Sequence, residues 1–214
     1  MNSLLILGAG GHGKVVAETA IATGDYSQIA FLDDNCNCKE TTEKILGWPV
    51  LNYFSYALSD DCRAKFSLAV VALGHAPTRL KWLKILTAAS YDCPVLIHPK
   101  AWVSPSASIS MGSVVFAQAA VQSEADIGIG AILNTGCGID HDVRLGAGVH
   151  ICPGAYLAAE VQVGDCSWIG IGASVIQQIR IGADVTIGAG AAVVTDLPDE
   201  VTAVGIPARI RSKQ

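Results

Sequence analysis

The second half of the chain repeats every six residues, and this repeat restricts the possible folds more than any other feature. From Val103 to Val193, an aliphatic residue occupies every sixth position without a break. A period of six does not match the 3.6-residue period of a helix face. It is typical of a solenoid in which each segment gives one short strand and one corner, with three segments to a triangular coil. The sixteen aliphatic positions are Val103, Ile109, Val115, Val121, Ile127, Leu133, Ile139, Leu145, Ile151, Leu157, Val163, Ile169, Val175, Ile181, Ile187 and Val193.

The residues between these positions fit the same solenoid. Four residues after each aliphatic residue the side chain is usually small, as at Ala119 and Ala125, and a glycine often follows the aliphatic residue directly, as at Gly128 and Gly146. We expect the aliphatic side chains to point inward and stack from coil to coil. The small side chains would fit the corners, where glycine would permit unusual backbone angles.

The first half of the chain follows a different pattern, in which strand and helix segments alternate. Such β-α-β order predicts a small parallel sheet with right-handed crossovers, here a Rossmann-like α/β domain over residues 1–98. Residues 99–214 would form the solenoid domain. The expected strands are Ser3–Leu7, Gln28–Leu32, Ser67–Leu73 and Pro94–Ile97, and the expected helices are His12–Thr23 and Pro77–Ala89.

Charge and hydrophobicity exclude several classes of protein. The net charge is −5 and no basic run is present, which argues against a nucleic-acid partner. No uninterrupted apolar stretch reaches the 18 residues of a membrane span, and the N-terminus lacks the basic region of a signal peptide. We therefore expect a cytoplasmic protein.

A glycine motif near the N-terminus has two interpretations. Gly8, Gly10 and Gly13 follow the apolar run LLIL in G-x-G-x-x-G spacing, and Asp33 and Asp34 come about where a ribose-binding acid would stand. Backbone N–H groups at the start of a helix suit a pyrophosphate, which NAD and nucleotide sugars both carry. Alternatively, the glycines serve only a tight turn and close helix packing. A domain of under 100 residues is half of a full dinucleotide fold.

The repeat over about residues 99–210 resembles the hexapeptide-repeat acyltransferases, which fold as a left-handed parallel β-helix. Nearly the whole chain is similar to the bacterial sugar O/N-acetyltransferases of sialic acid, bacillosamine and perosamine pathways. The segments that carry this similarity are GAGGHGKVV, FLDD, VALG, LIHP, NTGCGIDHD and GIPAR. This resemblance implies acetyl transfer from acetyl-CoA to the amino group of a nucleotide-linked 4-amino-4,6-dideoxy sugar. It also implies that the N-terminal domain holds the nucleotide. The candidate nucleotide contacts are Gly10, His12, Asp33, Asp34, Gly74 and Arg79.

Acetyl transfer to an amine requires a base, because an ammonium group is not nucleophilic, and histidine titrates in the right range. His141 takes the third place of its six-residue segment, where a side chain should project outward. The carboxylate of Asp142 would hold one imidazole nitrogen and make the other more basic. We interpret His141 as the general base; the alternative is an exposed corner histidine. Asn134 would form a hydrogen bond to the sugar acceptor or to the base; the alternative is a structural role in a ladder of side chains.

His150 lies nine residues after His141, which is half of one coil, so it belongs to another side of the prism. The two histidines would meet only between neighbouring chains, which predicts a homotrimer with active sites between subunits. The resemblance implies the same assembly. His150 would then contact acetyl-CoA; the alternative is packing at the trimer contact. The resemblance also implies neighbours of the CoA arm, which are Gly170, Ile171, Gly188 and Gly205.

Three other functions are alternatives to N-acetylation. O-acetylation of a sugar hydroxyl needs the same base and stays open. A metal hydratase of the γ-carbonic-anhydrase type needs three imidazoles, and only His141 and His150 follow His98, so no metal is expected. A non-catalytic trimer that binds a sugar nucleotide would not need His141.

Overall fold

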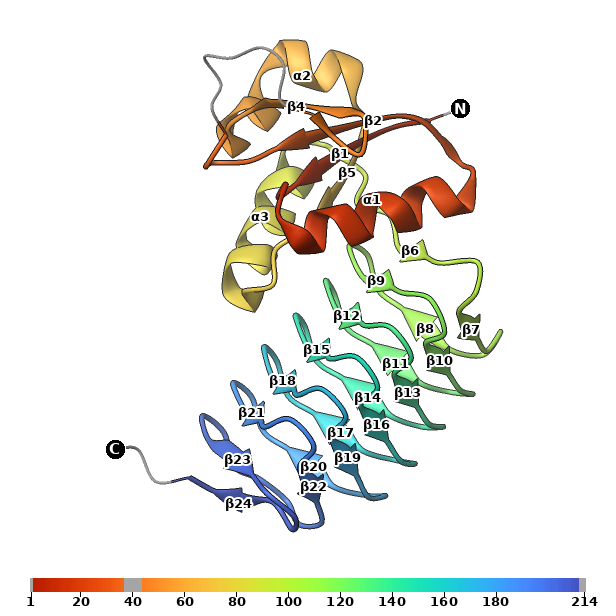
Figure 1. Cartoon of the computed structure of the whole chain (residues 1–214), viewed down its shortest axis with the longest axis vertical. Coiled ribbons are helices and arrows are strands. Elements are labelled where there is room, and N and C mark those ends of the chain that lie inside the picture. The colour runs from red at the N-terminus through yellow and green to blue at the C-terminus, as the bar shows by residue number, and fades with distance from the viewer. Residues whose placement is uncertain (1, 37–43, 212–214) are drawn as a thin grey trace. The chain divides into compact units, whose positions relative to one another are not determined.

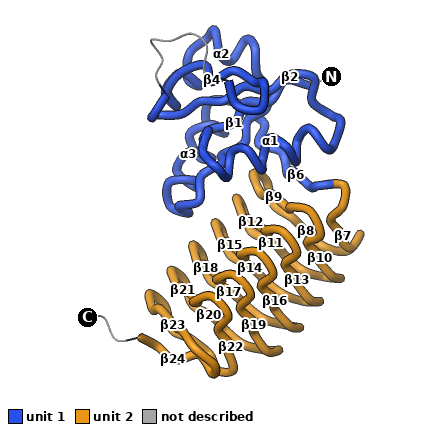
Figure 2. The backbone as a smooth tube through the Cα atoms, viewed as in Figure 1, with its two compact units in different colours: residues 1–98 blue, residues 99–214 orange. Residues whose placement is uncertain are grey.

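A computed structural model of the chain describes residues 2–36 and 44–211. The chain divides into two compact units, Met1–His98 and Pro99–Gln214, which Figure 2 shows in different colours. None of the helices in the described part of the chain is both long enough and apolar enough to cross a membrane.

The first unit is built on a five-stranded sheet of order β3-β4-β2-β1-β5. Strand β1 pairs in parallel with β2 and β5, and β2 pairs in parallel with β4, which confirms the expected parallel sheet. The sequence did not predict β3, which pairs antiparallel with β4 at one edge. The elements are β1 (Asn2–Leu7), α1 (Gly11–Thr23), β2 (Tyr26–Leu32), β3 (Lys44–Ile45), β4 (Trp48–Asn52), the 3-10 helix η1 (Phe54–Leu58), α2 (Asp60–Lys65), β5 (Leu68–Val71), α3 (Ala76–Ala88) and β6 (Leu96–Ile97).

The core of the first unit lies around β1, which pairs with β2 on one side and β5 on the other. Leu4, Leu5, Ile6 and Leu7 of β1 are all completely buried. A strand that has a neighbour on each edge and is covered on both faces reads as a continuous apolar run instead of an alternating one. The segment LLIL is therefore an interior strand of the sheet, and the glycine turn that follows it lies at the carboxyl ends of the strands.

The second unit is a parallel β-helix with three faces, seen as stacked coils in Figure 1. Each strand pairs in parallel with the strand one coil later, as Ala120 pairs with Gly138. The first face contains β7 (Trp102–Val103), β10 (Ala120–Val121), β13 (Gly138–Ile139), β16 (Tyr156–Leu157), β19 (Ser174–Val175) and β22 (Ala192–Val193). The second face contains β8 (Ser108–Ile109), β11 (Asp126–Ile127), β14 (Arg144–Leu145), β17 (Gln162–Val163) and β20 (Arg180–Ile181). The third face contains β9 (Val114–Val115), β12 (Ile132–Leu133), β15 (His150–Ile151), β18 (Trp168–Ile169), β21 (Thr186–Ile187), β23 (Thr202–Val204) and, antiparallel to β23, β24 (Arg209–Ile210).

The repeated aliphatic residues form the core of this prism. Each one is the second residue of a two-residue strand, and all of them from Val115 to Val193 are buried. The first two positions, Val103 and Ile109, are half-buried because they lie in the first coil. The inward orientation expected from the six-residue period is therefore confirmed.

The glycines that follow the aliphatic residues serve close approach, and not unusual backbone angles as the sequence had suggested. A Cβ atom on Gly164 would lie only 2.5 Å from the backbone nitrogen of Ala183 in the next coil. The left-handed angles instead occur two positions later, at the tip of each corner, as at Gly136 with φ +66° and Asp142 with φ +59°. Aspartate tolerates this conformation better than most residues. The residue after His141 is therefore the turning point of its corner.

Candidate active site

His141 and Asp142 form a pair at the corner between the first and second faces of the prism. The His141 side chain is half-exposed, and its Nδ1 lies 2.7 Å from Oδ2 of Asp142. The backbone N–H of His141 donates to Oδ1 of Asp140 at 2.8 Å. The imidazole thus points to solvent, while Asp142 holds its ring and Asp140 holds its backbone.

The surrounding acids alter the acid–base properties of His141. The hydrogen bond that Asp142 accepts raises the pKa of His141 above the ordinary histidine value, and the negative charges of Asp140, Asp142 and Glu160 act in the same direction. A carboxylate bonded to Nδ1 favours the tautomer with the proton on that nitrogen, which leaves Nε2 as the acceptor. The pair can therefore act as a general base whose accepting nitrogen faces outward.

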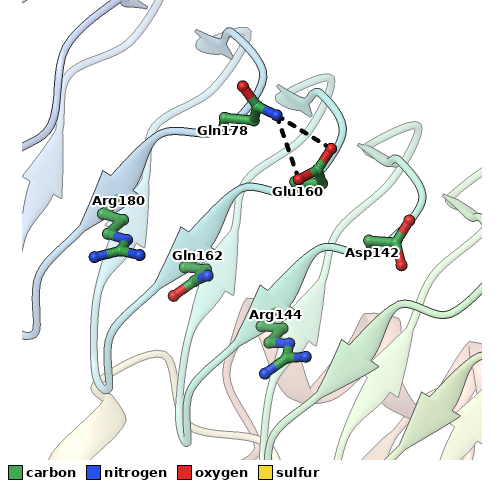
Figure 3. A pocket seen from close by; sticks show the side chains of 6 residues that line it. All are labelled: Asp142, Arg144, Glu160, Gln162, Gln178 and Arg180. Carbon is green, nitrogen blue, oxygen red and sulfur yellow. Dashed lines mark hydrogen bonds between the residues drawn. The ribbon is translucent and has the colours of Figure 1, made fainter.

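A polar groove lies beside this pair on the second face, with a volume of about 560 Å³. Figure 3 shows its lining in two rows, one at the corners and one along the strands. In the corner row, Nε2 of Gln178 donates to both carboxylate oxygens of Glu160, at 3.3 and 3.4 Å. The corner row is Asp142, Glu160 and Gln178, and the strand row is Arg144, Gln162 and Arg180.

A second groove, of about 380 Å³, lies on the first face and reaches the same corner at Asp140. Its most prominent side chain is the exposed Tyr156. Gly138 makes room for that ring, because a Cβ atom at this position would lie 2.3 Å from Cδ1 of Tyr156. His141 therefore lies at the corner between one charged groove and one largely apolar groove.

His150 lies on the third face and is not brought near His141 within one chain. It is buried, with 7% of its surface exposed, and its ring centroid lies 4.1 Å from that of Trp168. Its Nε2 lies 3.2 Å from Nδ2 of Asn134. Asn134 is thus a neighbour of His150 within one chain, and its bond to the acceptor or to the base stays a prediction. His150 itself packs against Trp168, and its contact with acetyl-CoA stays a prediction.

The residues expected beside the CoA arm share a part of the prism that does not include His141. Gly170 and Ile171 follow β18, and Gly188 follows β21, so they lie at the corner between the third and first faces. Asn134 follows β12 at the same corner, and Gly205 follows β23. Ile171 is exposed, whereas Gly170 is buried. The structure therefore groups these residues near His150.

In the first unit, two of the three motif glycines have packing roles. Gly8 has a φ of +112°, and a Cβ atom on Gly13 would lie 2.0 Å from the carbonyl oxygen of Gly8. At Gly10, which caps α1, a Cβ atom would meet nothing within 4 Å. The open space beside the helix start is therefore at Gly10, which is exposed.

The two aspartates after β2 brace the backbone around this turn. Oδ2 of Asp33 accepts the N–H of Ala9 at 2.7 Å, and Oδ1 of Asp34 accepts the N–H of Phe54 at 2.9 Å. The sequence had suggested that both carboxylates contact the nucleotide. Asp33 thus holds the glycine turn through one oxygen, and the nucleotide contacts of both aspartates stay predictions.

Arg79 is an unexpected internal support and not an exposed contact. It is 1% exposed, and its Nη1 donates to the carbonyl oxygens of Leu73 and Gly74 at 2.6 and 3.0 Å. It therefore positions the exposed Gly74 after β5. Burial, together with the charge of Arg79, lowers the pKa of His12 to about 4, so this imidazole is neutral near pH 7. The helical spacing of Ala76, Arg79 and Leu83 could have predicted that Arg79 lies on the buried face of α3.

The sequence analysis missed the strand row of the polar groove and Tyr156. A signal for them exists, because residues 18 positions apart lie side by side on a face. Asp142 and Glu160 are separated by 18 residues, and Arg144 and Arg180 by two such steps. Among residues 2–36 and 44–211, no group of three or more His, Cys, Asp or Glu side chains could hold a metal ion.

Known proteins resemble both units. The family described as the PglD N-terminal domain matches residues 3–86. UDP-N-acetylbacillosamine N-acetyltransferase of Bacillus subtilis (strain 168) is 40% identical over 118 residues, a match that covers 55% of this chain and 52% of that protein. The chain thus spans about half the length of this curated relative.

Two solved structures match over nearly the whole chain. The H141N mutant of perosamine N-acetyltransferase from Caulobacter crescentus, in complex with CoA and GDP-perosamine, has a TM-score of 0.93 and 38% identity, covering 100% of this chain and 98% of that one. The acetyltransferase domain of PglB from Neisseria gonorrhoeae FA1090, in complex with acetyl coenzyme A, has a TM-score of 0.92 and 44% identity, covering 99% and 100%.

Proposed function

The chain belongs to the hexapeptide-repeat sugar N-acetyltransferases, which carry a left-handed parallel β-helix, and on that premise we propose its reaction. We propose that it transfers the acetyl group of acetyl-CoA to the 4-amino group of a nucleotide-linked 4-amino-4,6-dideoxy sugar. The observation that carries this proposal is the His141–Asp142 pair, with Nδ1 of the exposed imidazole 2.7 Å from a carboxylate oxygen. GDP-perosamine and CoA in the Caulobacter relative support this choice of substrates.

In this reaction His141 acts as the general base. Nε2 takes a proton from the sugar amine, whose nitrogen forms a bond to the thioester carbonyl carbon while the bond from that carbon to sulfur breaks. Asp142 accepts the Nδ1–H and stabilises the imidazolium that forms. The proton then passes to the departing thiolate of CoA, so the base returns to its neutral form.

The two units would divide the binding of the substrates. We assign the nucleotide to the first unit, where Gly10 leaves open space at the start of α1 and Arg79 holds the exposed Gly74 in place. His12, Asp33 and Asp34 surround the same turn. We assign acetyl transfer to the second unit, whose residues near His150 include the expected neighbours of the CoA arm. Because acetyl-CoA and nucleotide sugars are metabolites of the cytoplasm, this function fits a cytoplasmic protein.

We further propose a homotrimer with active sites between subunits. His141 lies at the corner of the first and second faces, and His150 lies on the third face. The two imidazoles can therefore meet only if the prisms of neighbouring chains pack side by side. Large exposed apolar side chains on the prism, among them Trp102, Tyr156 and Ile171, support such packing.

Release of free thiol from acetyl-CoA tests the activity. The acceptors are 4-amino-4,6-dideoxy sugars linked to UDP, GDP or dTDP, each with a matched sugar that carries a 4-hydroxyl group. We expect thiol release with at least one amino sugar and not with its hydroxyl counterpart. His141→Ala should lower kcat by roughly 10²–10⁴, the usual effect of losing a positioned base. Gln177→Ala, at the matching corner position two coils later, should leave turnover intact. Turnover that His141→Ala leaves unchanged would exclude the assigned base.

A further inference from the structure

Two arginines in the polar groove have no charged partner in the part of the chain that the structure describes. Arg144 and Arg180 lie on the same face, each in register with Gln162 between them. Both are exposed. Within residues 2–36 and 44–211, neither guanidinium makes an ion pair or a hydrogen bond. The strand row of this groove therefore presents two positive charges to solvent.

The nearby carboxylates are engaged with other groups. Asp142 is bonded to His141, and both oxygens of Glu160 accept from Gln178. Oδ1 of Asp196 accepts the backbone N–H of Arg180 at 2.8 Å. Asp126 precedes Arg144 in the same column but forms no ion pair with it in the described part of the chain. A negative group from outside this chain would complete the arrangement.

We propose that the polar groove is a phosphate-binding site, in which Arg144 and Arg180 bind phosphate oxygens of a substrate whose reactive end reaches His141. Guanidinium binds phosphate through paired hydrogen bonds, which makes arginine well suited to this ligand. Neighbouring coils are about 4.8 Å apart, so the two arginines lie roughly 10 Å apart and can hold one diphosphate or two separate phosphates. Asp142 belongs both to the base pair and to the groove, which places phosphate and base side by side.

The inference rests on the proposed function, because it assigns the phosphates to its substrates. Two sources are available: the phosphates of acetyl-CoA and the diphosphate of the nucleotide sugar. The same guanidinium chemistry serves either one, and the two substrates can be varied independently in the assay.

Steady-state kinetics of Arg144→Gln, Arg180→Gln and the double variant test the site and identify the phosphate. We expect KM to rise roughly tenfold for one substrate in each single variant and more in the double variant, with kcat nearly unchanged. A rise for acetyl-CoA that is absent for acetyl-pantetheine, which lacks the nucleotide phosphates, assigns the site to acetyl-CoA. A rise confined to the sugar nucleotide assigns it to the diphosphate. Arg63→Gln, an exposed arginine of the first unit that pairs with Asp60, is the matched control.

Binding of inorganic pyrophosphate gives a readout that does not depend on turnover. Calorimetry should detect binding to the wild-type protein and to Arg63→Gln, and binding roughly tenfold weaker to the double variant. Equal pyrophosphate binding together with unchanged KM values would overturn the proposal. Dissociation of the oligomer by the arginine substitutions would also overturn it, because the row would then be a contact between copies. If the wild-type protein acetylates no sugar nucleotide, the proposed function fails, while calorimetry with acetyl-CoA still tests the groove.

Discussion

The basicity of His141 is set by the acidic residues around it, so its pH dependence reports on Asp142. Because a raised pKa keeps the imidazole protonated to higher pH, and only the neutral form accepts a proton, kcat/KM should rise with pH through that pKa. Asp142→Asn replaces the carboxylate by a neutral amide, which removes its charge and weakens the hydrogen bond that contributes most to the shift. We expect the acidic limb of the profile to move to lower pH.

The measurement is kcat/KM against pH at saturating acetyl-CoA. Asp126→Asn is the matched control, since it removes another exposed carboxylate of the same prism and should leave the limb in place. Glu160→Gln should move the limb in the same direction as Asp142→Asn, by a smaller amount, because its charge contributes less. A limb that stays in place in Asp142→Asn would mean that another group is titrating.

Single residues also show where reasoning from sequence ends. The six-residue register placed His141 outward without any structure, because its position in the segment determines its direction. The register could not show that Asp33 accepts the N–H of Ala9, nor that Arg79 bonds the carbonyls of Leu73 and Gly74. The first contact joins two segments that are 24 residues apart, and the second depends on how α3 packs against the loop after β5. Neither follows from a regular spacing of residues.

Among the elements, predictability followed periodicity. Each coil of the prism repeats the same pattern of inward and outward positions, so every strand from β7 to β22 falls on a predicted aliphatic position. The segment from β3 to α2 was not predicted, because its elements are short and have no regular apolar spacing. The antiparallel pairing of β3 with β4 depends instead on the turn at Leu46 and Gly47, where both residues have positive φ.

The close stacking of coils leads to a prediction about two kinds of glycine. Gly164→Ala would place a Cβ atom 2.5 Å from the backbone of the next coil, which can move only if the coils separate. We expect a loss of about 1–3 kcal/mol in the free energy of unfolding, the usual range for overpacking. Thermal denaturation followed by circular dichroism, at one fixed protein concentration, gives the comparison.

The control is Gly136→Ala at a corner tip, where φ is +66° and a Cβ atom would meet nothing within 4 Å. Only the strained backbone angle opposes this substitution, at a cost of about 1–2 kcal/mol. The two variants should destabilise the protein by different mechanisms, because only Gly164→Ala pushes neighbouring coils apart. If Gly164→Ala also lowered protection from hydrogen exchange at Ala183 and Gly136→Ala did not, the packing role would be established. Equal protection in both would contradict it.

At the scale of the whole molecule, the arrangement of faces requires more than one chain if His141 and His150 serve one reaction. The two residues lie on different sides of a prism whose interior is filled by aliphatic side chains. No rearrangement within one solid prism brings them together. A shared site therefore predicts that activity depends on the assembly and not only on the fold.

Mixing two inactive variants tests this dependence directly. His141→Ala lacks the base and His150→Asn lacks the buried imidazole, so assemblies of either variant alone should be nearly inactive. When equal amounts are dissociated and reassembled together, about a quarter of the sites in a trimer should combine an intact His141 from one chain with an intact His150 from its neighbour. Thiol release should recover to about that fraction of wild type, with sedimentation confirming a trimer.

The control is a reassembled mixture of His141→Ala with Gln177→Ala. Because Gln177→Ala keeps both histidines, this mixture gives the rate of thiol release expected when one of the two variants is fully active. Mixed trimers that stay as inactive as their parents would exclude an active site shared between subunits.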